Sequence, residues 1–411
     1  MFIFLLVFLS ASDFIWSAQW EHHIELHQEV RSFSNDESYL TRDNSYSIKI
    51  HNRSQWEYQR WSANFNNLLR RDPSKHRDSY LLQELWIRKE FDNLSLTIGS
   101  QIHDWTALEA FHPADVINAR NLDSNFERPE KIGEWMFNLE IPNDEAVWNF
   151  YYMPYLQTQK FPKVNSRLLI NNKPILFKRI MDHSGNFIAS KTVEQFGIRF
   201  EKSLDELDFS FHYINHYDRQ HPVIFSQLSN AGIFLGLPKV EQYGGTLTQI
   251  SDDHTLKLEC AYRNYDLELD SILPIINRPH SHFAIAVGFE LPRQLNHGAE
   301  LNYLLEVQTI LGPNRLNRTQ LNIFQRDLLI GARFARNDIY GTELLVSAIV
   351  DLERSTEILG QINFSRRIND NKKYELGLRF IEAKSTSIDD ISGLKPFDGD
   401  LQITGSLIHY F

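Results

Sequence analysis

Residues 299–309, AELNYLLEVQT, alternate between mostly apolar and mostly polar side chains. In an extended chain, one face of this segment carries Leu301, Tyr303, Leu305, Val307 and Thr309. The other face carries Glu300, Asn302, Leu304, Glu306 and Gln308. A helix would distribute the apolar residues around its whole surface, so this period of two indicates a β-strand whose faces meet different surroundings.

The same alternation recurs along most of the chain, for example in residues 207–217 and 283–289. A soluble β-sandwich also alternates, so alternation alone leaves that fold open. The connections favour a different fold, because short ones such as Asn337 and Asp338 alternate with long polar ones such as residues 102–131 and 158–190. One connection, near residues 352–356, is short where a long one is expected.

This sorting of loop lengths is typical of outer-membrane barrels, which have short periplasmic turns and long extracellular loops. A soluble sandwich has no reason to sort its loops in this way. We therefore expect an all-β fold, a transmembrane antiparallel β-barrel of about 16–18 strands.

The composition narrows the class of protein further. The chain has 411 residues and a formal net charge of -11, which argues against nucleic-acid binding because that needs clustered Lys and Arg. Its single cysteine, Cys260, excludes an intramolecular disulfide and a cysteine-based metal site, and we expect neither metal nor cofactor. The mean hydropathy of -0.38 is typical of soluble proteins, but alternation conceals the apolar face of a barrel.

The N-terminal residues have the pattern of a secretory signal peptide. Residues 1–9 form an apolar run that is too short to span a bilayer as a helix. Small residues that could mark a cleavage site follow at 10–12 and again at 17–18. We expect a signal peptide over residues 1–18 and a barrel over residues 19–411. A buried N-terminal strand is the alternative.

The C-terminal residues 401–411, LQITGSLIHYF, alternate in the same way and end on Phe411. This resembles the final strand of outer-membrane barrels, whose terminal phenylalanine is read by the barrel-assembly machinery. His409 stands where a second aromatic residue is usual. The resemblance implies that Phe411 is an assembly signal. It also implies three partners, namely the assembly machinery, outer-membrane lipid and lipopolysaccharide.

A second resemblance begins at Gly99 and Gln101, continues at Trp105, and ends in the segment FHPADVIN at 111–118. It is similar to the alginate-export-like porins and their uncharacterised outer-membrane relatives. In those proteins a strand ending in Gly-Arg-Gln leads to Trp-Gly and then to Asp-Val-hydrophobic-Asn-Pro. Three residues depart from that pattern, namely Ser100, Thr106 and Ala119. The resemblance implies a porin-like barrel in the outer membrane of a Gram-negative-type bacterium.

If Leu407 and Phe411 face lipid, alternation assigns a set of charged residues to the lumen. Its basic members are Arg88, Arg199, Arg263, Arg333 and Arg379. Its acidic members are Glu84, Glu140, Asp208, Glu259, Glu300, Glu306, Asp327, Glu343 and Glu375. Such charges either set an electric field across a pore or form a salt-bridged network that fills the barrel.

Residues 102–131 form a long connection rich in apolar residues, and a loop of that kind needs a surface to pack against. We expect it to fold into the lumen and narrow it, with Trp105 and Phe111 against the wall. Asp115, Asn118 and Arg120 are then candidate constriction residues. Alternatively, Asp115 and Asn118 only fix a turn through hydrogen bonds to nearby backbone.

These features together predict a porin-like channel for polar solutes or an extended polymer, whose identity the sequence leaves open. The alternatives are a non-conducting structural or surface-binding barrel and, third, an outer-membrane hydrolase. For a hydrolase, the nearest nucleophile pair is His183 and Ser184. Adjacent residues of an extended chain point apart, so we expect no catalytic pair and no enzyme.

Overall fold

The computed structural model describes residues 18–34, 44–73, 77–125, 128–163, 166–168, 174–226, 232–269, 275–354, 357–384 and 394–411. The signal peptide predicted for residues 1–18 lies outside the described residues except for Ala18. Within the described ranges, no helix is both long enough and apolar enough to span a membrane.

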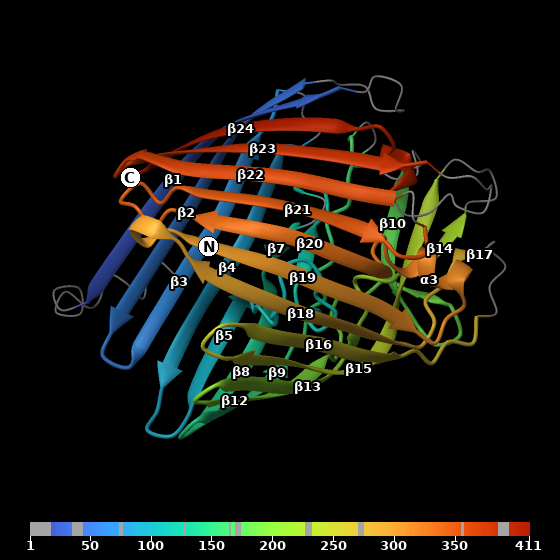
Figure 1. The fold of residues 1–411 in the computed structure, drawn as a ribbon. Coiled ribbons are helices and arrows are strands. Elements are labelled where there is room, and N and C mark those ends of the chain that lie inside the picture. Colours follow the sequence, from blue (N-terminus) through green and yellow to red (C-terminus); the bar gives the residue numbers. More distant parts are fainter. Residues whose placement is uncertain are drawn as a thin grey trace.

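The chain forms a closed antiparallel barrel of 18 strands, which confirms the predicted fold class (Figure 1). The wall strands, in order, are β1 (Gln19–Phe33), β2 (Asn44–Tyr58), β3 (Trp61–Arg71), β4 (Ser79–Glu90), β5 (Ser95–Gln101), β8 (Glu134–Asn143), β9 (Ala146–Tyr152), β12 (Phe196–Leu204), β13 (Leu207–Tyr217), β15 (Ile233–Ile250), β16 (Thr255–Asn264), β18 (His282–Gln294), β19 (Glu300–Leu311), β20 (Arg326–Ala335), β21 (Glu343–Asp351), β22 (Glu357–Asn369), β23 (Lys372–Ala383) and β24 (Leu401–Tyr410). Each pairs with the next, and β24 pairs with β1 to close the ring.

The turns at one end of the barrel are short. β2 and β3 are joined by two residues, and Gln59 has a φ of 53° there. Asp144, between β8 and β9, has a φ of 46°, and Asn337, between β20 and β21, has a φ of 53°. Left-handed residues of this kind suit tight hairpins, whose twist then matches the twist of the flanking strands.

The other end carries the longer connections and additional elements. β10 (Ile175–Met181), β11 (Phe187–Ile188), β14 (Val223–Ser226) and β17 (Ile275–Asn277) lie here, together with α3 (Arg315–Leu321) and η2 (Lys395–Phe397). β15 extends beyond the ring, and its first residues pair in parallel with β10 and antiparallel with β14. A further short helix, η1 (Asn296–Gly298), lies between β18 and β19.

The two faces of the wall strands differ as the alternation predicts. On β19, Leu305 and Val307 are 46% and 40% exposed on the outer surface, whereas Leu304 and Glu306 are buried inside the barrel. On β13, Phe211 is exposed and its neighbours Ser210 and His212 are buried. The barrel therefore has an apolar outer surface and a largely polar interior, the arrangement expected of a strand set between lipid and lumen.

Candidate functional site

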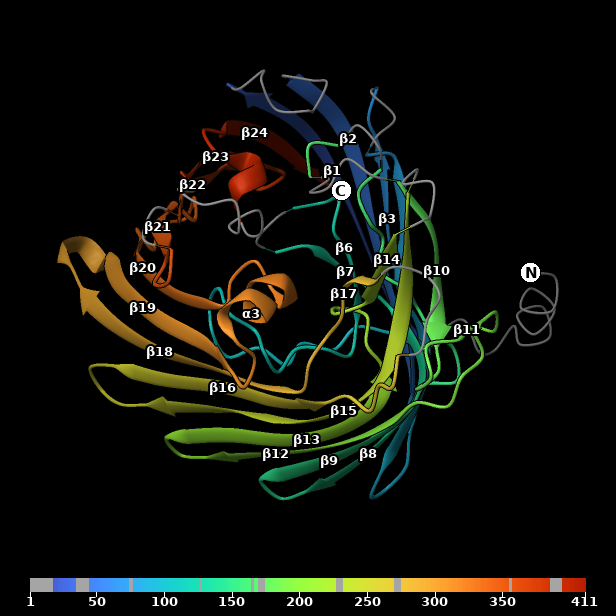
Figure 2. The ribbon, with the colours of Figure 1, turned by 90° about the vertical axis from the view of Figure 1, so that its right-hand side faces the viewer.

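Residues 102–133, here called the lumen segment, connect β5 to β8 and run inside the ring of strands (Figure 2). Two short strands, β6 (Ala119–Asn121) and β7 (Glu130–Ile132), pair with each other within this segment. β5 and β8 themselves are neighbours in the wall, so the segment leaves the wall and returns to it at the same place. Its apolar side chains Trp105, Leu108 and Phe111 are buried in clusters that include residues of the wall strands.

Trp105 holds the first part of the lumen segment against the wall. Its side chain is 3% exposed and belongs to an apolar cluster with Val116 and Ile117 of the segment and Tyr151 and Ile214 of the wall. The Trp105 ring lies 4.7 Å from the ring of His212, and the Arg199 guanidinium lies 4.9 Å from its centroid. This cluster and the stacked cation fix the position of the segment on the β9–β13 side.

Phe111 holds the segment against a different part of the wall. Together with Leu108, it packs in a buried cluster with Ala286 of β18, Leu304 of β19, Leu329 of β20 and Ile349 of β21. The segment therefore crosses the interior from β5 as far as β21. Two apolar anchors at separate places on the wall prevent it from moving freely in the lumen.

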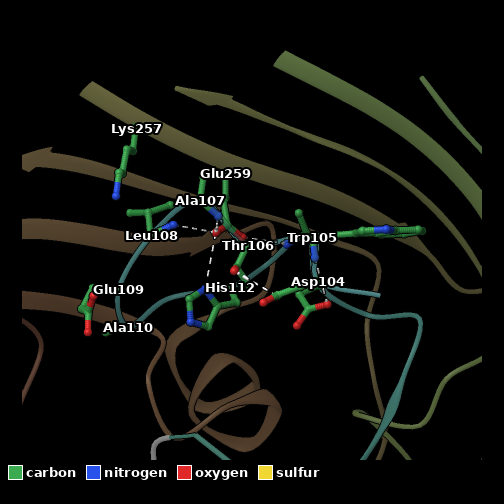
Figure 3. A network of polar contacts seen from close by, with 12 residues as sticks. Asp104, Trp105, Thr106, Ala107, Leu108, Glu109, Ala110, His112, Lys257 and Glu259 are labelled. Carbon is green, nitrogen blue, oxygen red and sulfur yellow. Dashed lines mark hydrogen bonds and ion pairs between the residues drawn. The ribbon is translucent and has the colours of Figure 1, made fainter. Parts of the chain in front are cut away.

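Between these anchors, two wall carboxylates bind the backbone of the segment, and Figure 3 shows the contacts of the first of them, Glu259. Glu259 Oε1 accepts hydrogen bonds from the N–H groups of Ala107 and Leu108, at 2.6 and 3.0 Å. Glu306 accepts from the N–H groups of Glu109 and Ala110, at 2.5 and 2.9 Å. Hydrogen bonds to an ionised acceptor are stronger than neutral ones, so these four contacts fasten the segment firmly.

The structure changes the expected role of Glu259 and Glu306. The sequence places both among the charges that face the lumen water, but both are buried beneath the segment. The physical reason is that four backbone N–H groups of the segment lie against these two carboxylates. Buried N–H groups need acceptors, and the carboxylates supply them. Their negative charges therefore stabilise the segment rather than line an open pore.

Asp115, Asn118 and Arg120 shape the segment internally. The Asp115 carboxylate is buried and pairs with Arg120 at 2.6 Å and with Lys131 at 2.7 Å. Asn118 accepts from the His103 N–H and donates to the carbonyl oxygens of Gln101 and Ile132. The Asn118 contacts are to nearby backbone groups, as the structural alternative expects, whereas the Asp115 carboxylate pairs mainly with the side chains of Arg120 and Lys131.

Four of the five arginines assigned to the lumen are candidate pore residues, and the structure places two of them at the larger cavity and two away from it. Arg333 and Arg379 line the larger cavity of the lumen. Arg88 pairs with Glu140 at 2.7 Å, and buried Arg263 donates to Gln242, with both outside the lining of that cavity. Arg263 is fixed further by Gln220 and His221 from the connection after β13. The structure therefore brings two of these four arginines together at one cavity.

The open part of the lumen lies along the strands on the far side of the segment. A cavity of about 400 Å³ there is bounded by the segment, by β20 to β24 and by β1. A second cavity, of about 230 Å³, continues along β1, β2 and β24. Both are lined by Glu29, Glu375 and Ser406, so the two cavities adjoin, and we refer to them together as the path beside the segment.

Several residues of this path were not among the predicted site residues. Glu109 of the segment pairs with Arg128 and, at 2.8 Å, with Arg333 of the wall. Burial raises the pKa of the Glu109 carboxyl, but the two guanidiniums outweigh burial and hold its pKa below the ordinary value. On β1, Arg31 pairs with Glu29 at 3.0 Å. The only sequence signal for Glu109 was its place between the apolar anchors Leu108 and Phe111.

His183 and Ser184 differ from the prediction that their side chains point apart. Ser184 Oγ lies 3.1 Å from His183 Nε2, because these residues sit in a turn rather than on an extended strand. The pair is exposed at the loop end, and among the described residues no carboxylate forms an ion pair with the His183 ring. Among the same residues, no group of three His, Cys, Asp or Glu side chains could hold a metal ion.

The fold is similar to those of solved outer-membrane porins. The chain aligns with OccK3 (OpdO) of Pseudomonas aeruginosa over 99% of both chains, with a TM-score of 0.55 and 10% identity. It aligns with OccK11 (OpdR) of the same bacterium over 95% of this chain and 96% of that one, with a TM-score of 0.54 and 9% identity.

No protein-family model and no curated protein matches the sequence. At these identities, the structural likeness defines a class of fold, the porin-like β-barrel, and nothing finer. The alginate-export-like family suggested by residues 99–118 is not supported by these neighbours.

Proposed function

We propose that this protein is a porin-like channel in the outer membrane of a Gram-negative-type bacterium. The observation that carries the proposal is the pair of adjoining cavities beside the lumen segment, inside a closed barrel whose outer face is apolar. A pore needs such space lined by polar groups, whereas in a plugged barrel the segment and its ion pairs would fill the interior. Polar solutes would pass between the lumen segment and strands β20 to β24.

We further propose that the lumen segment forms the constriction. Glu109, Arg128 and Arg333 would face the solute, because they border the larger cavity. Trp105, Phe111, Asp115, Asn118 and Arg120 would hold the segment in its narrowing position. We also propose, from the sequence motif alone, that the protein is related to the alginate-export-like porins. Passage of an extended polymer through the channel is a further proposal.

The proposed partners are outer-membrane lipid, lipopolysaccharide and the barrel-assembly machinery. Deleting Phe411 is expected to reduce insertion into the outer membrane strongly, because the terminal residue would be part of the assembly signal. The side chain is 71% exposed, and its backbone makes two hydrogen bonds to Ile24, so its loss costs few contacts. Comparing heat-modifiable barrel in outer-membrane fractions with refolding yield in detergent separates assembly from stability. Wild-type amounts of the deletion variant in the outer membrane would contradict the role of Phe411 as an assembly signal.

The proposed channel function is tested by solute entry into proteoliposomes. Liposomes that contain the refolded barrel are expected to admit small polar solutes, whereas empty liposomes and liposomes with heat-denatured protein are not. A folded, inserted barrel that admits none of a panel of neutral, anionic and cationic solutes would favour the non-conducting alternative. Hydrolysis of ester or peptide substrates that is lost on replacing Ser184 by alanine would favour the hydrolase.

A further inference from the structure

Three adjacent wall strands, β22, β23 and β24, bring nine lumen-facing residues into register. The strand pairing arranges them in three rows, which are Gln361, Arg379 and Gln402; Asn363, Gly377 and Thr404; and Ser365, Glu375 and Ser406. All nine line the cavity of about 400 Å³. Six of them carry a neutral amide or hydroxyl group. We call these nine residues the polar patch.

Gly377 lies at the centre of the polar patch. Because it has no side chain, it leaves space above the strand backbone, and we call this space the open floor of the patch. A Cβ atom added there would lie 3.3 Å from Asn363 Oδ1 and 3.6 Å from Thr404 Cβ, which are both side-chain atoms. Its φ is outside the left-handed region, so the backbone does not require glycine. Glycine inside a strand weakens it and often marks a place where a ligand approaches the backbone closely.

The charges around the cavity balance one another. Four acidic residues line it, namely Glu29, Glu109, Glu343 and Glu375, and four basic residues, namely Arg31, Arg128, Arg333 and Arg379. Arg31 is engaged with Glu29, and Arg333 lies 2.8 Å from Glu109 and 3.1 Å from Glu343. A charged solute would therefore compete with ion pairs that already exist, and would gain little from the net field.

We propose that the polar patch is a binding subsite for uncharged polyhydroxylated solutes of the saccharide type. Amide and hydroxyl groups both donate and accept hydrogen bonds, as do the hydroxyl groups of such a solute. A guanidinium and a carboxylate, from Arg379 and Glu375, stand on either side of the open floor at Gly377. The volume of about 400 Å³ lies within the range of small-molecule sites. The inference rests on the proposed channel function.

The first test compares three probes on single wild-type channels in planar bilayers. Maltose, which is neutral, is expected to interrupt the ion current at lower concentration than glucuronate or glucosamine, which carry one charge each. Tighter block by glucuronate or glucosamine would overturn the proposal, and so would normal conductance without any block by maltose. A folded, inserted barrel without ion conductance would instead overturn the channel function itself.

The second test changes the patch without changing its size. Asn363→Leu together with Thr404→Val removes hydrogen-bonding groups at nearly constant volume. The affinity for maltose is expected to fall about tenfold, which corresponds to the loss of one or two ordinary hydrogen bonds. Asn363→Gln with Thr404→Ser is the matched control and should retain binding. Wild-type affinity for maltose in the first double variant would overturn the proposal.

A third variant tests the open floor directly. Gly377→Leu would project a side chain from the floor into the cavity, since only two side-chain atoms lie near the added Cβ. Block by maltose is expected to disappear in this variant, and the salt conductance to fall because the path is narrower. Unchanged block by maltose would show that the solute binds elsewhere in the lumen.

Discussion

Leu305→Arg is expected to lower the free energy of unfolding by roughly 2–4 kcal/mol, because it places a charge in the hydrocarbon layer. Leu305 lies midway along β19, with its side chain on the apolar outer surface. A charge near the middle of the bilayer is costly, and the cost decreases toward either interface. The measurement is equilibrium unfolding in lipid vesicles, with heat-modifiability as a check that the variant forms a barrel.

A matched pair on another strand controls for the substitution itself. Ile362 and Asn363 are adjacent near the middle of β22, and Ile362 is exposed on the outer surface whereas Asn363 lines the lumen cavity. Ile362→Arg should destabilise the barrel as Leu305→Arg does, and Asn363→Arg should be tolerated because its charge reaches water. Equal tolerance of Ile362→Arg and Asn363→Arg would mean that water bathes both faces, contrary to a membrane barrel.

Removal of residues 107–121 is expected to raise the conductance of the channel and weaken its ion selectivity while the barrel still assembles. The deletion removes the anchors Leu108 and Phe111 and uncovers Glu259 and Glu306 to the lumen. Pairing between β5 and β8 does not involve the deleted residues, so the wall remains continuous. Unchanged conductance and selectivity in a folded deletion variant would show that the segment does not narrow the path.

A milder variant tests how the segment is fastened. Glu306→Gln replaces one acceptor oxygen by an amide donor, so one N–H of Glu109 or Ala110 loses its partner, at a cost of about 1–3 kcal/mol. We expect brief interruptions of the single-channel current (flicker) in this variant, because the lumen segment is held less firmly. Glu343→Gln is the control, because Glu343 contacts Arg333 instead of segment backbone. Flicker in both variants, or in neither, would contradict the fastening role of Glu306.

The wall of the barrel could be predicted from sequence because its pattern is local. Each outward residue of β19, such as Leu305, differs in polarity from its inward neighbour, such as Glu306, and a period of two needs no knowledge of the partner strand. The prediction that residues 102–131 enter the lumen also used a local property, their apolar content. Apolar side chains such as Trp105 and Phe111 need a surface to pack against.

The partners inside the lumen could not be predicted in this way. Glu259 and Glu306 bind residues about 150 and 200 positions away, and which backbone groups they meet depends on the path of the segment. At the loop end, β15 begins at Ile233 and its first residues pair in parallel with β10, outside the antiparallel ring that the alternation predicts. Polar loop residues carry no period that would reveal such pairing.

The central claim, that this barrel encloses an open path, is tested most directly by its ion conductance. Purified, heat-modifiable wild-type protein would be inserted into a planar lipid bilayer, and single-channel currents recorded in potassium chloride. We predict current steps of one uniform size, because the adjoining cavities beside the lumen segment would conduct as a single path. Insertion of folded barrel without any current step would contradict the claim.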